Sequence, residues 1–273
     1  MRCLSFLEIM NKNNQIIIII SFSDIYRQQH FYEELKENNQ EDFIWELIWI
    51  EAAGMEGCNC YCDDMAAEMI REKIVPYEPT GIHFLDSGNY HYMSRFWLEK
   101  IQTPFRLLVF DNHTDMQPPA FGGLLSCGGW IRAALEELPL LKEVILIGPD
   151  QEAFDQTEPE LREKVRFLSR EKLAEMEKEA CRTFGDSVPE DLPLYISVDK
   201  DVLNTKEAST TWSQGDMTLD ELMCWLSWFR KRENIIGMDV CGESDPDTAE
   251  KDYLNDQANR KILKFWMEGR KKL

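Results

Sequence analysis

The sequence lacks any long apolar run. Its longest stretch of large aliphatic residues is Ile16–Ile20, far short of the roughly 20 residues that a membrane-spanning helix needs. The opening segment, MRCLSFLEIMNKNN, has a short apolar patch that Glu8 interrupts, and no small-residue cleavage site follows it, so no signal peptide is predicted. We therefore expect a cytoplasmic protein with no membrane partner, in which residues 1–14 are a candidate for a dispensable extension.

Positive charge is also scarce. The 273-residue chain has 30 Lys and Arg against 50 Asp and Glu, which gives a net charge of −20 and a pI near 4.6. Such a chain repels nucleic acid and anionic membranes, and we expect neither as a partner. The same negative field would attract a small cationic substrate.

A second set of cysteine ligands is missing. Three of the eight cysteines form the cluster CNCYC, at Cys58, Cys60 and Cys62. Zinc knuckles usually combine two ligand pairs, and no second pair accompanies this cluster, so it predicts no zinc site by itself. In a chain of this length without an export signal, reduced thiols are the default.

Linkers, internal repeats and low-complexity tracts are absent as well, which favours one domain over residues 1–273. Several short apolar runs are near-continuous in Val, Ile, Leu and Phe, as strands buried on both faces tend to be. The predicted strands are 15–22, 43–50, 81–88, 105–111, 141–148, 164–169, 192–199 and 234–240.

Helical patterns fill the gaps between these runs. The predicted helices are 62–74, 169–184, 218–232 and 254–272. Thr218 and Glu221 have the spacing of a capping box, which marks the start of the third helix. Strands that alternate with helices predict a three-layer α/β/α fold with a mainly parallel sheet.

Metal-binding side chains follow three of the predicted strands. The run FRLLVF leads into Asp111, His113 and Asp115, at two-residue steps. The run that ends near residue 198 leads into Asp199 and Asp201, and His91 follows the run that ends near residue 88. Functional groups of open α/β sheets gather beyond the carboxyl ends of the strands, so we expect these side chains to meet.

A cation is the simplest partner for such carboxylates, because unpaired carboxylates are costly beside an apolar strand. Only Lys200 is interleaved, and it would face the other side. Six ligands suit two divalent ions if some carboxylates bridge, and the +4 of two ions balances four aspartates. Oxygen-rich donors with one imidazole for each ion favour Mn²⁺, with Zn²⁺, Ni²⁺ and Fe²⁺ as alternatives.

Each motif also has an ordinary structural explanation. A lone D-x-D is usually a loop or a helix cap, and a lone histidine is usually a surface or core residue. All three motifs in this order, each after an apolar run, favour the metal site.

These motifs resemble those of the arginase–agmatinase–formiminoglutamase family, the ureohydrolases. FDNHTD is similar to the family's D-A-H-x-D, SVDKDVL to its S-x-D-x-D, and GMDVCGE to its closing G-x-D-V-x-E. SGNYHY stands where the family has G-G-D-H, and SQGDMTLDEL resembles its G-G-L-T-x-x-E segment. The resemblance runs from about residue 80 to residue 245.

The resemblance implies an arginase-like fold with two Mn²⁺ ions per chain. It implies that Asp111 and Asp199 bridge the ions and that His91 and Asp115 complete one coordination sphere. Asp115 would also hydrogen-bond the attacking hydroxide and take its proton.

His113 and Asp201 would complete the second sphere. The implied reaction is hydroxide attack on a non-peptide C–N bond of a small guanidino or amidino compound. Relatives are commonly oligomeric, so the C-terminal segment RKILKFWMEGRKKL is a candidate surface for a homo-oligomer.

Three departures from the family pattern leave the substrate open. Tyr90 precedes His91 where the family has Asp. Cys127, in LLSCGG, stands where arginases have a proton-shuttling histidine, and is a candidate for that role. Glu243 lies four residues after Asp239, where three is usual, so it is either a substrate-pairing acid or a cap or loop residue.

Two other functions are weighed beside this one. One is hydrolysis of a linear amide, as in the related deacetylases, although these lack the full second-metal ligand set that His91, Asp115 and Asp201 complete here. The other is a catalytically silent metal-binding regulatory protein, which the changed first motif and the missing shuttle histidine favour. Trp212, on the loop after the D-x-D motif, is a candidate to wall the pocket and stack on a cation.

Overall fold

All eight predicted apolar runs form strands of one sheet in the computed structural model, which describes residues 14–35, 44–119, 122–176, 184, 192–244 and 249–270. The strands are β1 (Asn14–Ser21), β2 (Ile44–Glu51), β4 (Gly81–Phe84), β5 (Phe105–Phe110), β7 (Leu141–Ile147), β8 (Val165–Leu168), β9 (Leu194–Asp199) and β10 (Ile235–Cys241). Their order is β2-β1-β4-β10-β9-β5-β7-β8, and every pairing is parallel. The predicted parallel sheet is confirmed.

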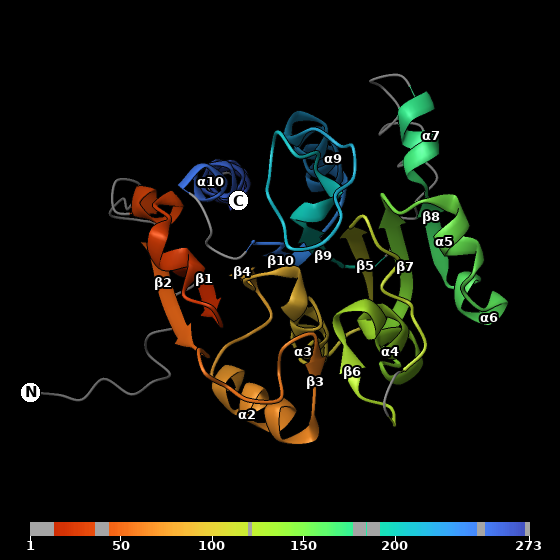
Figure 1. The fold of residues 1–273 in the computed structure, drawn as a ribbon, viewed down its shortest axis with the longest axis horizontal. Coiled ribbons are helices and arrows are strands. Elements are labelled where there is room, and N and C mark those ends of the chain that lie inside the picture. The colour runs from red at the N-terminus through yellow and green to blue at the C-terminus, as the bar shows by residue number, and fades with distance from the viewer. Residues whose placement is uncertain are drawn as a thin grey trace, which may run out of the picture.

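Helices cover both faces of this sheet, so the three-layer prediction is also confirmed (Figure 1). The helices α9 (Leu219–Arg232) and α10 (Ala249–Arg270) lie on one face. The helices α2 (Asp64–Ile74), α3 (Met93–Leu98) and α4 (Trp130–Glu137) lie on the other. Successive strand residues point to opposite faces, so Ile17 and Ile19 enter the first core while Ile18 and Ile20 enter the second.

Helix boundaries agree less closely with the sequence prediction. The capping box of Thr218 and Glu221 starts α9 as expected, and the Asp63 side chain caps α2 by accepting from Ala66 N. The predicted helix 169–184 is interrupted, because α7 (Arg170–Glu175) ends where Met176 turns extended; Phe184 is again helical, and residues 177–183 lie outside the described part. The last helix starts at Ala249, five residues before the predicted 254.

A short strand pair was missed by the sequence analysis. The strands β3 (Tyr61–Cys62) and β6 (Leu125–Ser126) pair antiparallel, with Tyr61 opposite Ser126. Just beyond them, the Cys127 backbone N–H donates to the Cys60 carbonyl over 2.9 Å. The pair therefore joins the CNCYC segment to the segment that holds Cys127.

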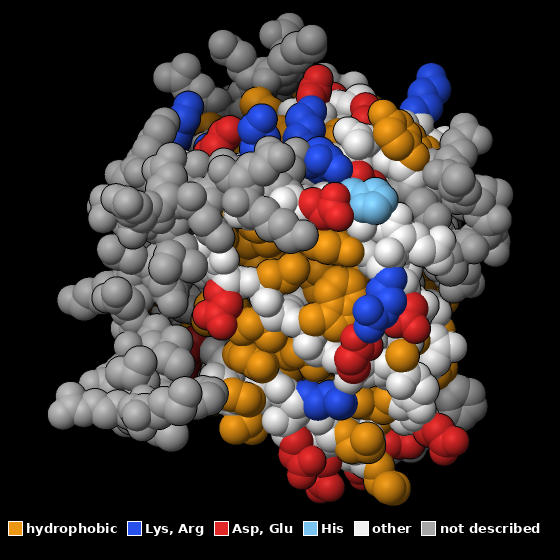
Figure 2. Space-filling model, turned by 90° about the vertical axis from the view of Figure 1, so that its left-hand side faces the viewer, with side chains coloured by type: hydrophobic (Ala, Val, Ile, Leu, Met, Phe, Trp, Pro, Cys, Tyr) orange, Lys and Arg blue, Asp and Glu red, His pale blue; other side chains and the backbone are white. Residues whose placement is uncertain are grey.

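The β2 side of the molecule is a sheet edge with apolar side chains. Figure 2 shows hydrophobic groups in the middle of this face, with acidic and basic groups among them. Leu47 is 37% exposed on β2, while the Arg27 guanidinium lies 5.0 Å from the Trp49 ring centre and pairs with Glu51. Charged groups at an edge strand oppose pairing with another sheet.

Two further expectations concern the N-terminal segment and membrane-spanning helices. The proposed extension, residues 1–14, lies outside the described residues except for Asn14, the first residue of β1. Among the described helices, none combines the length and the apolar character needed to cross a membrane.

Candidate metal centre

Three strands of one neighbouring set deliver the candidate ligands to one edge of the sheet. In the order β4-β10-β9-β5, the carboxyl ends of these strands lie side by side. Asp111 follows β5 directly, and Asp199 is the last residue of β9. After β4, a 3-10 turn (Gly88–Tyr90) carries the chain to His91, just before α3.

His91 faces three carboxylates. Its Nδ1 atom lies 3.2 Å from Asp111 Oδ2, 3.1 Å from Asp115 Oδ2 and 3.5 Å from Asp199 Oδ2. None of these four side chains is more than 7% exposed. Donor atoms that share an ion at about 2.0–2.3 Å lie about 3–3.5 Å from one another, so this spacing fits a common cation.

His113 forms a second group with Asp111 and Asp201. Its Nδ1 atom lies 2.8 Å from Asp201 Oδ2 and 3.6 Å from Asp111 Oδ1. The two oxygens of Asp111 thus face different histidines, as a carboxylate shared by two ions would. The structure brings all six predicted ligands together.

The hydrogen bonds around His91 determine which ring nitrogen is available to a ligand. Ser197 Oγ donates to Asp239 Oδ1 over 2.6 Å, so it accepts from His91 Nε2–H at 2.9 Å. The lone pair of Nδ1 is then left facing the carboxylates. Similar outer partners orient the imidazole ligands of protein metal sites.

The buried donors of this group have no adequate partner in the protein. His91 Nδ1 and Asp111 Oδ2 make no hydrogen bond. Within the described ranges, no Lys or Arg forms an ion pair with Asp111, Asp115, Asp199 or Asp201. A lone pair held against carboxylate oxygens is repulsive unless a proton or a metal ion lies between them, so the residues fit a divalent cation.

Several supporting residues were not predicted from the sequence. Trp130 Nε1 donates to Asp115 Oδ2 over 2.7 Å and holds this carboxylate, whose backbone is left-handed with φ 49°. Ser213 Oγ lies 2.9 Å from His113 Nε2, so Ser213 contacts the outer nitrogen of His113 as Ser197 contacts that of His91. Tyr90, which stands where the family motif has Asp, stacks on Phe22 at 4.0 Å instead.

A cavity of about 270 Å³ is lined by five of the six predicted ligands, all except His91. Its lining comprises Cys60, Tyr61, Gly88, Asp111, His113, Asp115, Gln117, Ser126, Cys127, Gly128, Asp199, Asp201 and Trp212. Trp212 is 43% exposed and lies edge-on to the His113 ring at 6.2 Å. A larger cavity of about 520 Å³ is lined by none of the six cluster residues, so it is not the candidate active site.

Glu243 does not line this cavity, and its contacts do not support the substrate-pairing role considered above. It is fully buried, where it pairs with Lys200 and accepts from Gln29 Nε2 (2.8 Å) and Asn259 Nδ2 (2.7 Å). Gly242, at the position three residues after Asp239, has φ 88°, and a Cβ atom there would lie 2.4 Å from Asp199 Oδ1. The position where the family places its acid therefore has no room for a side chain.

Burial controls the proton affinity of the cluster. Burial and the charges of Asp201 and Asp111 raise the pKa of Asp199 to about 7. Burial and the charge of Asp111 raise the pKa of Asp201 to about 6. Burial alone would lower the pKa of His113, but its bonds to Asp111 and Asp201 raise it to about 12.

These pKa values predict how the metal-free protein responds to pH. A carboxyl group with a raised folded-state pKa contributes stability below its unfolded pKa of about 4, and this stability is lost as the pH rises through the folded value. His113, with its raised pKa, loses its contribution above about pH 6.5, in the same direction. We expect the melting temperature of the chelated protein to fall by roughly 5 °C or more from pH 5 to pH 8.

Thermal unfolding in chelator, followed by circular dichroism, measures this fall. The control is the double variant Asp199→Asn, Asp201→Asn, whose melting temperature should change less with pH because the two titrating groups are gone. With saturating divalent ion the wild type should instead gain stability toward pH 8, since ions and protons compete for the same ligands. A chelated wild type that is equally stable at both pH values would contradict the assignment.

Comparisons with known proteins agree with the fold and with the motifs. The Arginase family model matches residues 81–263. An uncharacterised protein of Thermotoga maritima is 30% identical over 252 residues, which cover 90% of this chain and 88% of that protein.

Two solved structures illustrate the likeness in fold. The agmatine ureohydrolase of Thermoplasma volcanium superposes with a TM-score of 0.66 at 15% identity, over 95% of this chain and 90% of that one. The formimidoylglutamase of Bacillus subtilis subsp. subtilis str. 168 gives 0.65 at 16% identity, over 94% and 86%. With the family match over residues 81–263, these findings show that the chain belongs to the arginase family of metal-dependent hydrolases.

Proposed function

We propose that the protein is a dinuclear-metal hydrolase that cleaves a non-peptide C–N bond of a small guanidino or amidino compound. The observation that carries this proposal is the pair of donor groups that share Asp111: His91, Asp111 and Asp115 on one side, and Asp111, His113 and Asp201 on the other. Two divalent ions held there would supply a hydroxide nucleophile near neutral pH. For the group that contains His113, whose donors are oxygen and nitrogen only, we propose Mn²⁺.

The chain's own residues would hold and orient the reacting groups. Asp111 would contribute to both donor groups, and Asp199 would be a ligand on the His91 side. Asp115 would accept the proton of the nucleophile, and the bond from Trp130 Nε1 to its Oδ2 orients this carboxylate. Trp212 and Tyr61 would enclose the substrate, because both line the cavity.

The cavity lining favours a second candidate substrate class. Outside the metal-ligand candidates, the described lining residues are uncharged and include Tyr61, Gln117, Ser126 and Trp212. No carboxylate is left there to pair with a guanidinium, although the face of Trp212 could hold a cation. A small neutral amide therefore stays an alternative substrate to the amidine or guanidine.

A substrate panel tests the function directly. Protein loaded with Mn²⁺, Zn²⁺ or both would be incubated with small guanidines, formimidoyl compounds and amides, and released urea, ammonia or amine would be measured. Turnover of a guanidine or formimidoyl compound supports the proposal, and turnover of amides alone supports the second candidate. Full metal loading without turnover of any class would show that the site binds ions without catalysis.

Cys127 provides a prediction about proton transfer. It lines the cavity, but burial and the nearby Asp115 charge raise the pKa of its thiol to about 12, so it holds its proton near neutral pH. We expect Cys127→Ser to lower the turnover number less than about 10-fold, whereas loss of an acid–base group lowers it about 10²–10⁴-fold. A fall of 100-fold or more in the turnover number, with unchanged metal content, would instead support Cys127 as the proton shuttle.

A further inference from the structure

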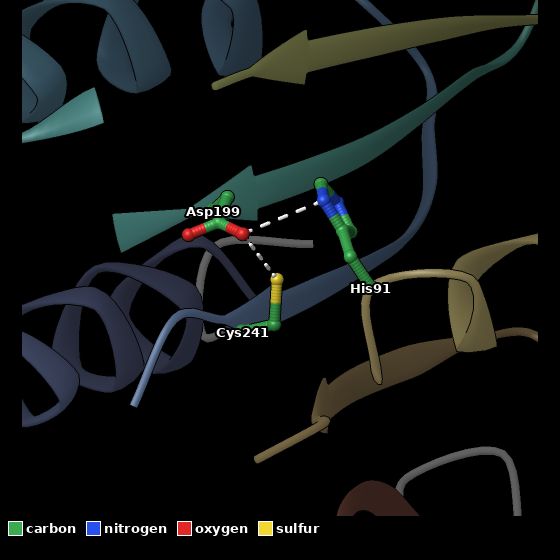
Figure 3. Close-up of side chains that lie close together, drawn as sticks. All are labelled: His91, Asp199 and Cys241. Atoms are coloured by element: carbon green, nitrogen blue, oxygen red, sulfur yellow. Dashed lines mark hydrogen bonds and ion pairs between the residues drawn. The ribbon is translucent and has the colours of Figure 1, made fainter. Parts of the chain in front are cut away.

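A buried thiol adjoins the His91 half of the site. Cys241 ends β10, is fully buried, and pairs in register with Asp199 at the end of β9. Residues paired in register on neighbouring strands point to the same side of the sheet. Figure 3 shows Cys241, Asp199 and His91 converging from three segments.

The distances place the sulfur among the donor atoms rather than behind them. Cys241 Sγ lies 3.2 Å from Asp199 Oδ2, and the same oxygen lies 3.5 Å from His91 Nδ1. All three donor atoms lie within 4.8 Å of one another, as do those of His91, Asp111 and Asp115. The two groups share His91.

An independent feature points to a ligand at this place. His91 is 1% exposed, and its Nδ1 atom makes no hydrogen bond, while Ser197 occupies the other ring nitrogen. The free ring nitrogen thus lies beside the same Asp199 oxygen that the Cys241 sulfur contacts. Asp199 Oδ1 already accepts from the Asp201 backbone at 2.9 Å, which leaves Oδ2 for this point.

We propose that the Cys241 sulfur is a direct ligand of the ion that His91 and Asp199 hold. This inference rests on the metal centre of the proposed function and specifies it. Thiolate ligands favour Zn²⁺, Fe²⁺ and Co²⁺ over Mn²⁺, whereas the group of Asp111, His113 and Asp201 has no sulfur donor. The centre is therefore asymmetric, with a thiophilic ion on the His91 side and an ion that prefers oxygen on the His113 side.

The ordinary alternative is that the Cys241 thiol only donates a hydrogen bond to Asp199. Serine keeps that hydrogen bond but offers no thiolate, so Cys241→Ser separates the two roles. Cys224→Ser is the matched control, because Cys224 is exposed on α9 and belongs to none of the donor groups.

The test is the absorption spectrum of the Co²⁺-loaded full-length protein, with bound cobalt counted by elemental analysis. We expect sulfur-to-cobalt charge-transfer absorption in the wild type and in Cys224→Ser, and its loss in Cys241→Ser. In competition between Zn²⁺ and Mn²⁺, Cys241→Ser should shift the preference toward Mn²⁺ by about tenfold or more.

The outcomes separate this inference from the proposed function. Bound cobalt without the charge-transfer band, or with a band that persists in Cys241→Ser, overturns the sulfur ligand and leaves the hydrolase proposal standing. Failure of the wild type to bind any divalent ion overturns both. If Cys241→Ser does not fold, X-ray absorption of the zinc-loaded wild type decides, since a ligating sulfur scatters at about 2.3 Å from zinc.

Discussion

Replacement of Asp199 by alanine should abolish stoichiometric ion uptake and lower turnover more than about 100-fold. Asp199 faces His91 and is a candidate direct ligand. In metal sites, residues that only hydrogen-bond to a ligand already contribute about 10–100-fold to metal affinity or activity, so loss of a direct ligand should cost more. Without metal, the variant should be at least as stable as the wild type at pH 8, because one buried carboxylate of a repelling group is gone. Elemental analysis, turnover on the best substrate of the panel, and thermal unfolding in chelator measure the three effects.

Two further variants give this experiment its controls. Asp199→Asn keeps an oxygen for the hydrogen bond from the Asp201 backbone but removes the charge, and it should lose metal almost as fully. Asp216→Ala removes an exposed carboxylate outside the cluster and should leave metal content at the wild-type value. Normal ion uptake by Asp199→Ala would show that the cluster is not the metal centre.

Replacement of Lys200 by methionine should lower the free energy of unfolding by about 3–5 kcal/mol. Lys200 and Glu243 are both fully buried and form an ion pair, and removal of one partner leaves a buried, uncompensated charge. Glu243 also links three parts of the chain, through Gln29, Asn259 and the end of β10. Denaturant unfolding of the chelated protein measures the loss without a contribution from bound metal.

An exposed pair serves as the control for Lys200. Lys261 pairs with Asp220, and their side chains are 42% and 88% exposed, so Lys261→Met should change stability by less than about 1 kcal/mol. The double variant Lys200→Met, Glu243→Gln should recover part of the loss, because it removes both charges. Equal effects of the two lysine variants would rule out a special role for the buried pair.

The sheet could be predicted from the sequence because strands buried on both faces appear as short apolar runs. The side chains of the run IIIII pack into the cores on both faces of the sheet. This explains why the run shows no alternation of apolar and polar residues. The helix α3 could not be predicted in the same way. All six of its residues are buried, so MSRFWL has no polar face from which helical periodicity could be recognised.

The ligand candidates could be predicted because D-x-H-x-D and D-x-D follow apolar runs directly. Their supporting residues could not, because their positions depend on strand register. Asp239 lies opposite Ser197, and Cys241 lies opposite Asp199, in a pairing that no local motif specifies. Trp130, fifteen residues after Asp115, meets it only through the fold.

The backbone at Gly242 restricts how this protein could acquire the substrate acid of its relatives by evolution or engineering. Replacement of Gly242 by Glu would place the new Cβ atom 2.4 Å from Asp199 Oδ1. It would also require Glu to adopt a left-handed backbone conformation that glycine tolerates best. A point substitution at this position is therefore insufficient. The backbone of the turn after β10 would have to change first, so that a side chain at position 242 no longer meets Asp199.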